Sequence, residues 1–332
     1  MNILPVFIPH MGCPNLCVFC NQRSITGAAA IVPSQEEICR MAEEAVERTG
    51  RKGFELAFYG GSFTSIPKQI QKDCLDAASG LFRRGLISSI RISARPDAMD
   101  DETLDFLSGY PVKTVELGVQ SMEDKVLELA ARGCASQDAI DAAERVKARG
   151  ISLILQMMAG LPGESQSSPM ETARRIAELC PDGVRIYPVV VIKGTELEKM
   201  WLRGEYEPLD VDRAADICAD LLEFFGEKGI PVIRCGLNPS EELKGEVAAG
   251  AYHPAFGEIA RSRLMFKKVC AAAEKLKPRP AELRIFVHPS FVSPMIGQRR
   301  ENILRLKDRF GFSKVEVKSA DIEPGKVEIT AI

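Results

Sequence analysis

Strand and helix signals alternate six times over the first two-thirds of the 332-residue chain, and this alternation constrains the fold most strongly. Each short apolar run is followed by a stretch with helical character. The expected strands cover residues 4–9, 54–59, 87–93, 114–118, 152–159 and 184–191. Strands joined through helices pair in parallel, because a parallel connection needs a long crossover. The sequence therefore predicts an α/β fold, a partial (β/α)6 TIM-like barrel with its active site where strands end and loops begin.

The pattern changes after about residue 205, where the regular alternation stops. The expected elements there are a helix at 210–228, a strand at 231–237 and a helix at 252–275, followed by a proline-rich linker at 276–280. A small βαββ unit follows, with elements at 283–287, 295–310, 314–318 and 327–331. We therefore expect a core barrel over residues 1–205, an extension of it over 206–277 and a small C-terminal α+β domain over 281–332.

Composition excludes several classes of protein. Apolar residues make up 45% and charged residues 27%, which rules out a disordered chain, a fibre and a disulfide miniprotein. The net charge of −3 gives no global sign of nucleic-acid binding, although a local basic patch is compatible with it. No apolar run is long enough to span a bilayer, and the N-terminus lacks signal-peptide features. We expect a cytoplasmic protein with no membrane partner.

Three of the ten cysteines, Cys13, Cys17 and Cys20, lie together directly after the first expected strand. The other seven are scattered singly, which is unlike a secreted disulfide framework and indicates a reducing compartment. Three thiolates with C-x3-C-x2-C spacing can converge on one metal site. A 4Fe–4S cluster normally has four cysteine ligands, so three indicate an iron that is open to another ligand. A structural zinc site that adds His10 as the fourth ligand is the alternative.

Several motifs, taken in order, resemble a known family. The cysteine loop and the βα units are similar to the radical SAM (S-adenosylmethionine) superfamily, and the match extends to the radical SAM core of the catalytic subunit of the Elongator tRNA-modifying complex. The motifs that carry this resemblance are Pro9–Pro14, Thr114–Ser121, Met157–Gly163, Arg185–Pro188, Val191–Leu197, Trp201 and Gly204–Tyr206. The resemblance runs from about residue 5 to about residue 209. Because the sequence ends at Ile332, we expect no acetyltransferase domain like the one in that subunit.

The resemblance implies a cofactor set. Cys13, Cys17 and Cys20 would bind a 4Fe–4S cluster whose open iron takes the amino and carboxylate groups of S-adenosylmethionine. Gly60 and Gly61, with Ser62 in place of a glutamate, match the turn that binds the amino group in relatives. A plain strand–helix turn is the alternative for these residues.

Three further residues match cofactor positions in the resembled relatives. Gln120 and Arg132 match contacts to the ribose and the carboxylate of S-adenosylmethionine, chemistry that suits an amide and a guanidinium. Gln156 takes a polar position on the fifth strand. Arg132, followed by Gly133, is equally compatible with a helix C-cap. Ser93 stands where relatives often carry a glutamate, so one contact is missing.

The resemblance also implies the function. We expect an enzyme that cleaves S-adenosylmethionine to a 5′-deoxyadenosyl radical and modifies its substrate by hydrogen abstraction. The expected substrate is RNA, with tRNA first, and the expected partner is a reducing electron donor such as flavodoxin or ferredoxin. Two alternatives stay open: a radical SAM enzyme for a small molecule or a protein, and a non-enzymatic, metal-stabilised RNA-binding protein.

A second motif lies in the C-terminal unit. Ile296–Ile303 is similar to the Ile-Gly-x-x-Gly-x-x-Ile loop of KH domains, which clamps single-stranded nucleic acid. Arg300 replaces the second glycine of that loop. The expected helix is basic, with Arg299, Arg300, Arg305, Lys307 and Arg309, which favours contact with phosphates. An ordinary charged helix on a capping domain is the alternative.

Overall fold

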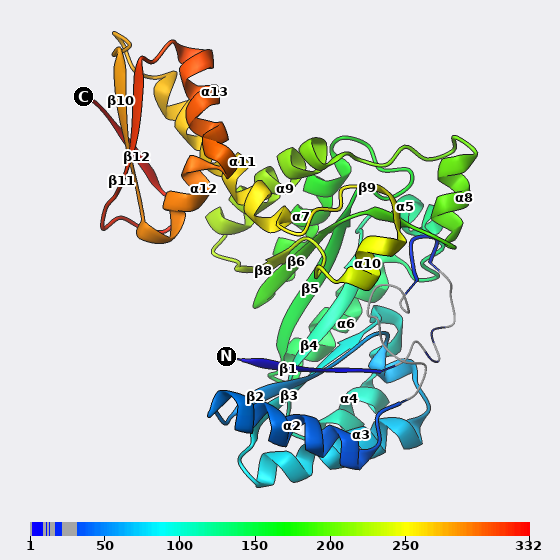
Figure 1. Cartoon of the computed structure of the whole chain (residues 1–332). Helices are drawn as coiled ribbons and strands as arrows, with labels where there is room; N and C mark the ends of the chain where they lie inside the picture. The colour runs from blue at the N-terminus through cyan, green and yellow to red at the C-terminus, as the bar shows by residue number, and fades with distance from the viewer. Residues whose placement is uncertain (1, 9–10, 12, 14–16, 22–31) are drawn as a thin grey trace.

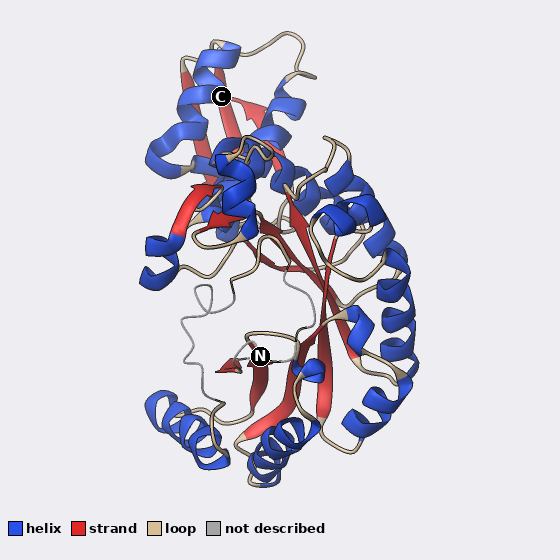
Figure 2. Ribbon diagram, turned by 90° about the vertical axis from the view of Figure 1, so that its right-hand side faces the viewer, coloured by secondary structure: helices blue, strands red, loops and turns tan. Residues whose placement is uncertain are grey.

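The computed structural model describes residues 2–8, 11, 13, 17–21 and 32–332, and its centre is a seven-stranded parallel sheet (Figure 1). The strands, in spatial order, are β1 (Ile3–Phe7), β2 (Phe54–Tyr59), β3 (Ile87–Ala94), β4 (Val112–Gln120), β5 (Ser152–Ala159), β6 (Gly183–Pro188) and β8 (Val232–Cys235). The sheet curls into an open arc with helices on its convex side (Figure 2). The predicted α/β, partial-barrel fold is confirmed. The seventh strand, β8, is the strand expected at 231–237, and it joins the edge of the same sheet as the six barrel strands.

Seven helices accompany the strands. They are α2 (Gln35–Thr49), α3 (Lys68–Arg83), α4 (Asp101–Ser108), α5 (Asp124–Leu129), α6 (Ser136–Ala148), α7 (Ser168–Glu178) and α9 (Val211–Glu227). The start of α2 shows how local sequence sets these bounds, because Ser34 and Glu37 form the reciprocal hydrogen bonds of a capping box. The main apolar core is shared between the helices and the outward-facing strand residues.

The strand expected over 184–191 is divided in two. Pro188 ends β6, and β7 (Val190–Ile192) pairs instead with β9 (Val247–Gly250) as a separate antiparallel sheet. Proline has no N–H to give to a ladder, which explains the break. Two short helices that the sequence did not predict, α8 (Glu196–Leu202) and α10 (Glu241–Glu246), accompany this small sheet.

Residues 256–332, here called the C-terminal module, begin with α11 (Phe256–Ala273). The module continues with β10 (Glu282–Val287), α12 (Val292–Ile296), α13 (Glu301–Phe310), β11 (Lys314–Ser319) and β12 (Val327–Ala331). The sheet order is β11-β10-β12, with β11 parallel and β12 antiparallel to β10. The first turns of α11 pack in the barrel core, and its second half packs in a separate apolar core formed with this sheet.

The prediction of a single helix over residues 295–310 is wrong, because the structure has two helices there. Gly297, with φ of 75°, ends α12, and Arg299 and Arg300 have φ of 49° and 63°. Three left-handed residues cannot continue a right-handed helix, so α13 begins only at Glu301. Within the described part of the chain, no helix combines the length and apolar character needed to cross a bilayer.

Candidate active site

The three clustered cysteines lie in the loop that follows β1, where parallel strands end. The Cys20 N–H donates to the Cys17 carbonyl at 2.9 Å, which folds this part of the loop into a turn. Val18 fixes the turn from both sides: its N–H donates to Ala130 O at 3.0 Å, and its carbonyl accepts from Leu197 N at 2.8 Å. The loop is thereby tied to the end of α5 and the start of α8. His10, the ligand of the zinc alternative, lies outside the described residues.

Two buried arginines face the cysteine sulfurs. Arg95 Nη1 lies 3.8 Å from Cys13 Sγ, and Arg132 Nη1 lies 3.6 Å from Cys17 Sγ. Arg95 is 3% exposed and Arg132 is 6% exposed. Arg95 also forms a bidentate pair with Asp97 and donates from Nη2 to Arg132 O at 2.7 Å. Buried cations need nearby negative charge, and thiolates that hold an iron–sulfur cluster supply it.

The donor set therefore fits a 4Fe–4S cluster with S-adenosylmethionine. Arg132 Nε is buried and has no hydrogen-bond partner among the described residues, so an acceptor is needed beside it. Sequence reasoning singled out Arg132 but did not include Arg95 in the site. The sequence signal for Arg95 was its place directly after the third strand, at the end where barrel enzymes carry their active sites.

The structure brings Gln120, Gln156 and Arg132 together at the ends of β4 and β5. Gln156 Nε2 donates to Gln120 Oε1 at 3.2 Å, and Arg132 Nη2 donates to the Gly118 carbonyl at 2.5 Å. A register shift between Gly118 and Gln120, with φ of 71° at Gln120, turns this side chain across the strand end. A Cβ on Gly118 would lie 2.9 Å from Gln120 Nε2 and 3.2 Å from Arg132 Nη2, so a larger residue would displace these two side chains from their observed positions.

The turn after β2 is fixed by close backbone packing. Gly60 has φ of 108°, and a Cβ there would lie 2.3 Å from the Ile8 carbonyl oxygen, so the turn requires glycine. Gly61 is half-buried beside Ile8 and Ser62. Ser62 is 5% exposed, and its Oγ accepts from Arg95 N at 3.1 Å and from Ser65 Oγ at 2.9 Å. Ser62 thus ties the end of β2 to the end of β3, beside the arginine that faces Cys13.

A buried polar network that sequence reasoning missed lies on the concave face of the sheet. Glu116 Oε1 accepts from Arg91 at 2.5 Å, Arg185 at 2.8 Å and the Tyr59 hydroxyl at 3.0 Å. Burial, and then the Glu116 charge, raise the pKa of Tyr59, so its hydroxyl keeps its proton and donates. Glu55 completes the network by accepting from Arg91 at 2.8 Å and from a threonine of β4 at 2.7 Å.

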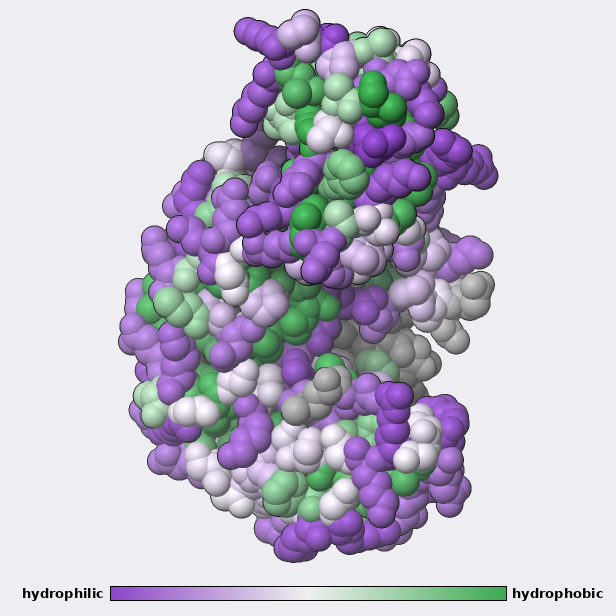
Figure 3. Space-filling model, turned by 90° about the vertical axis from the view of Figure 1, so that its left-hand side faces the viewer, coloured by the Kyte–Doolittle hydropathy of each residue, from purple (hydrophilic) through white to green (hydrophobic). Residues whose placement is uncertain are grey.

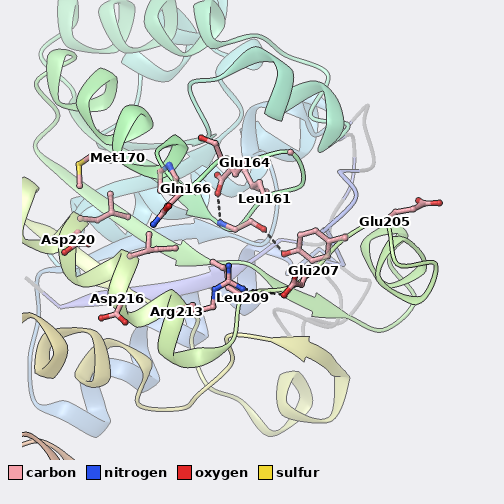
Figure 4. Close-up of a pocket in the computed structure, with 17 residues that line it drawn as sticks. Leu161, Glu164, Gln166, Met170, Glu205, Glu207, Leu209, Arg213, Asp216 and Asp220 are labelled. Carbon is pink, nitrogen blue, oxygen red and sulfur yellow. Dashed lines mark hydrogen bonds and ion pairs between the residues drawn. The ribbon is translucent and has the colours of Figure 1, made fainter. Parts of the chain in front are cut away.

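A cavity of about 680 Å³ opens beside the loop after β5 (Figure 4). Glu164 Oε2 accepts from Gly160 N at 2.6 Å, and the Tyr206 hydroxyl donates to the Gly160 carbonyl at 2.6 Å. Glu164 Oε1 is buried without a hydrogen-bond partner in the described residues. Burial raises the pKa of Glu164 to about 7, although the backbone N–H groups of Gly160 and Leu161 oppose the shift. Glu164 therefore carries a proton for a large part of the time near neutral pH.

We expect Glu164→Gln to stabilise the protein in mildly alkaline solution only. The folded state holds the Glu164 proton more tightly than the unfolded chain does, so wild-type stability falls as pH rises from about 4.5 to about 7. Glutamine keeps an acceptor for Gly160 and removes the titration. In urea unfolding, the free energy of unfolding of the variant should exceed that of the wild type by about 1–3 kcal/mol at about pH 8 and equal it at about pH 4. An equal effect at both pH values would contradict the raised pKa.

Comparisons with known proteins identify the family of the chain. The model of the radical SAM superfamily matches residues 7–176, over half of the chain, and the radical SAM C-terminal domain matches residues 181–265. An uncharacterised protein of Methanocaldococcus jannaschii is 36% identical over 233 residues, which cover 66% of this chain and 70% of that protein. The tRNA uridine(34) acetyltransferase of the same archaeon is 32% identical over 196 residues, which cover 52% of this chain and 36% of that enzyme.

The chain thus spans little more than a third of that acetyltransferase. A solved structure of the archaeal Elp3 of Methanocaldococcus infernus has a TM-score of 0.63 at 23% identity, covering 80% of this chain and 64% of that one, and it shows the same fold. The resemblance that the motifs predicted is confirmed. The chain belongs to the radical SAM superfamily, whose enzymes use a 4Fe–4S cluster and S-adenosylmethionine.

Proposed function

We propose that this radical SAM enzyme modifies RNA, beginning with abstraction of a hydrogen atom from a nucleoside carbon. The observation that carries the radical chemistry is the pairing of Cys13 and Cys17 with the buried guanidinium groups of Arg95 and Arg132. The choice of RNA is supported by relatives named as tRNA uridine(34) acetyltransferases, which match about half of this chain.

Each residue of the site has a role in this proposal. Cys13, Cys17 and Cys20 would hold the cluster, and Arg95 and Arg132 would balance its negative charge. Bound together, the cluster and S-adenosylmethionine supply 5′-deoxyadenosyl radical chemistry, and the protein orients this chemistry and shields it from water.

The strand ends would hold S-adenosylmethionine itself. Gln120 and Gln156 present amide groups suited to ribose hydroxyls, and Arg132 Nε is suited to a carboxylate. The turn at Gly60 and Gly61 allows the backbone to approach a ligand closely. A small reduced carrier such as flavodoxin or ferredoxin would deliver the electron.

RNA should stimulate the cleavage of S-adenosylmethionine. We expect anaerobic, cluster-loaded protein with dithionite to form 5′-deoxyadenosine faster when total tRNA is added, because a bound substrate completes the site. The same tRNA digested to nucleosides is the control, and the products are separated by liquid chromatography. Mass spectrometry of the recovered tRNA should then show a new modified nucleoside. Equal rates with intact tRNA, digested tRNA and no addition would contradict an RNA substrate.

A further inference from the structure

Positive charge is concentrated in the C-terminal module. Residues 256–332 contain 16 Lys and Arg against nine Asp and Glu, a net charge of +7. Residues 1–255 contain 27 Lys and Arg against 37 Asp and Glu, a net charge of −10. The overall charge of −3 hides this asymmetry, which is typical of a chain with one polyanion-binding part. In Figure 3 the module, at the top, presents mostly hydrophilic side chains among scattered apolar ones.

The module has a loop built to present arginines. Residues 297–300 join α12 to α13, and Gln298, Arg299 and Arg300 are all exposed. Neither arginine forms an ion pair within the described ranges of the chain. The backbone of Arg299 and of Arg300 is in the left-handed region. This conformation costs about 1 kcal/mol or more for a residue other than glycine, so contacts elsewhere in the fold must stabilise it.

Buried contacts beneath the loop fix its position. Asn302 is 3% exposed, and its Nδ2 group lies within 3.2 Å of the carbonyls of Ser262, Pro294 and Met295. A Cβ on Gly297 would lie 3.1 Å from Ser262 Oγ, so the loop packs closely on α11. The two arginines are therefore carried by a rigid turn and not by a free segment.

A groove of about 570 Å³ lies beside this loop, between α9, α11 and the two helices that the loop joins. Its polar lining includes Gln298 and Arg261, the carboxylates of Glu258 and Glu301, and Arg305, and Phe291 supplies an aromatic ring. Two of the bordering arginines are already neutralised, Arg263 by Asp212 and Asp216 and Arg305 by Glu301 at 3.4 Å. The Arg261 guanidinium has no ion pair among the described residues, and a guanidinium beside a half-buried aromatic ring matches the chemistry of a phosphodiester backbone with an unstacked base.

We propose that the C-terminal module binds single-stranded RNA, with the phosphate backbone on the 297–300 loop and the bases along the neighbouring groove. The helix–loop–helix between two parallel, adjacent strands has the loop position at which KH domains clamp four nucleotides of backbone. The arginine at position 300 replaces close backbone approach with a charge contact. The inference extends the proposed function, since it gives the RNA-modifying barrel a separate site that holds its substrate.

The test is RNA binding by the full chain without reductant or S-adenosylmethionine. Fluorescence anisotropy follows a labelled, unstructured RNA oligonucleotide and its duplex, over a range of salt concentrations. The test variant is Arg299→Glu with Arg300→Glu. The matched control is Arg48→Glu with Arg83→Glu, which makes the same charge change at exposed positions on α2 and α3. Circular dichroism checks that each variant is folded.

We expect the loop variant to bind single-stranded RNA at least about tenfold more weakly, with the control close to wild type. The slope of log K against log salt should be about 1.4 smaller in magnitude for the variant than for the wild type. Each phosphate contact on a single strand contributes about 0.7 to this slope, and the variant loses two. A second variant, Arg299→Gly with Arg300→Gly, suits the left-handed turn and should also bind more weakly, which separates lost charge from lost folding.

Equal weakening in the loop variant and the control would overturn the proposal, because binding would then follow net charge alone. Binding of the duplex as tightly as the single strand, unchanged binding by the glycine variant, or no binding by the wild type would also overturn it. These outcomes concern RNA binding by the C-terminal module, because no turnover is measured. The proposed function is tested separately, by the stimulation of 5′-deoxyadenosine formation when tRNA is added.

Discussion

Cys17→Ala should reduce 5′-deoxyadenosine formation to the level of a reaction without enzyme. Cys17 is 6% exposed, and its sulfur faces Arg132, so the alanine removes a cluster ligand and leaves a buried cation without its partner. The sequence of this loop offers no fourth cysteine that could replace a lost one. Iron, sulfide and visible absorbance, measured on anaerobically reconstituted protein, should fall together with the product.

The matched control for this prediction is Cys39→Ala. Cys39 lies half-buried on α2, packed against the barrel core, and alanine suits a helix well. We expect this variant to keep its full iron content and its activity. If Cys17→Ala kept both the cluster and the product, the cysteine loop would not be the cluster site.

The strand framework could be predicted from the sequence because its signals are local. The expected strands at 54–59 and 152–159 match β2 and β5 at both ends. In each case a mainly apolar run, interrupted only by Glu55 or Gln156, ends at a glycine or glycine pair. A backbone with φ near 100° at Gly60 and Gly160 stops the strand there. The cysteine loop was equally local, since three ligands lie within eight residues.

The residues that complete the site could not be found in this way. Arg95 faces Cys13 across a separation of 82 positions in the chain, and nothing near it in the sequence indicates a sulfur partner. The break between α12 and α13 was also hidden, because Arg299 and Arg300 are good helix formers. Tertiary contacts made by Asn302 and Gly297 override that preference.

The network on the concave face shows the same limit. Strands of a parallel sheet are normally apolar on both faces, yet β2, β3, β4 and β6 each place a charged residue inward. Strand order and register bring Arg91 and Arg185 to one carboxylate, and neither quantity can be read from single-strand patterns. The role of each charged residue on the concave face therefore becomes clear only when the strands are assembled into the sheet.

Glu116→Ala should destabilise the protein by about 3–5 kcal/mol, the cost of leaving buried cations without a counter-charge. Glu116 is 4% exposed, and the side chains of Arg91 and Arg185 are 11% and 12% exposed, so water cannot replace the lost carboxylate easily. Glu55 still neutralises Arg91, but among the described residues Arg185 keeps only tyrosine hydroxyls as hydrogen-bond partners. Urea unfolding followed by far-ultraviolet circular dichroism measures the loss.

The exposed pair Arg40–Glu44 provides the matched control, because both side chains are about two-thirds exposed and 3.7 Å apart. Glu44→Ala should change stability by less than about 0.5 kcal/mol, since solvent screens such a pair. Added salt should leave the Glu116→Ala loss almost unchanged, because ions do not reach a buried pair. A loss below about 1 kcal/mol for Glu116→Ala would mean that water enters the concave face and solvates Arg185. The barrel interior would then be wet, and shielding of a radical would have to come from the bound substrate.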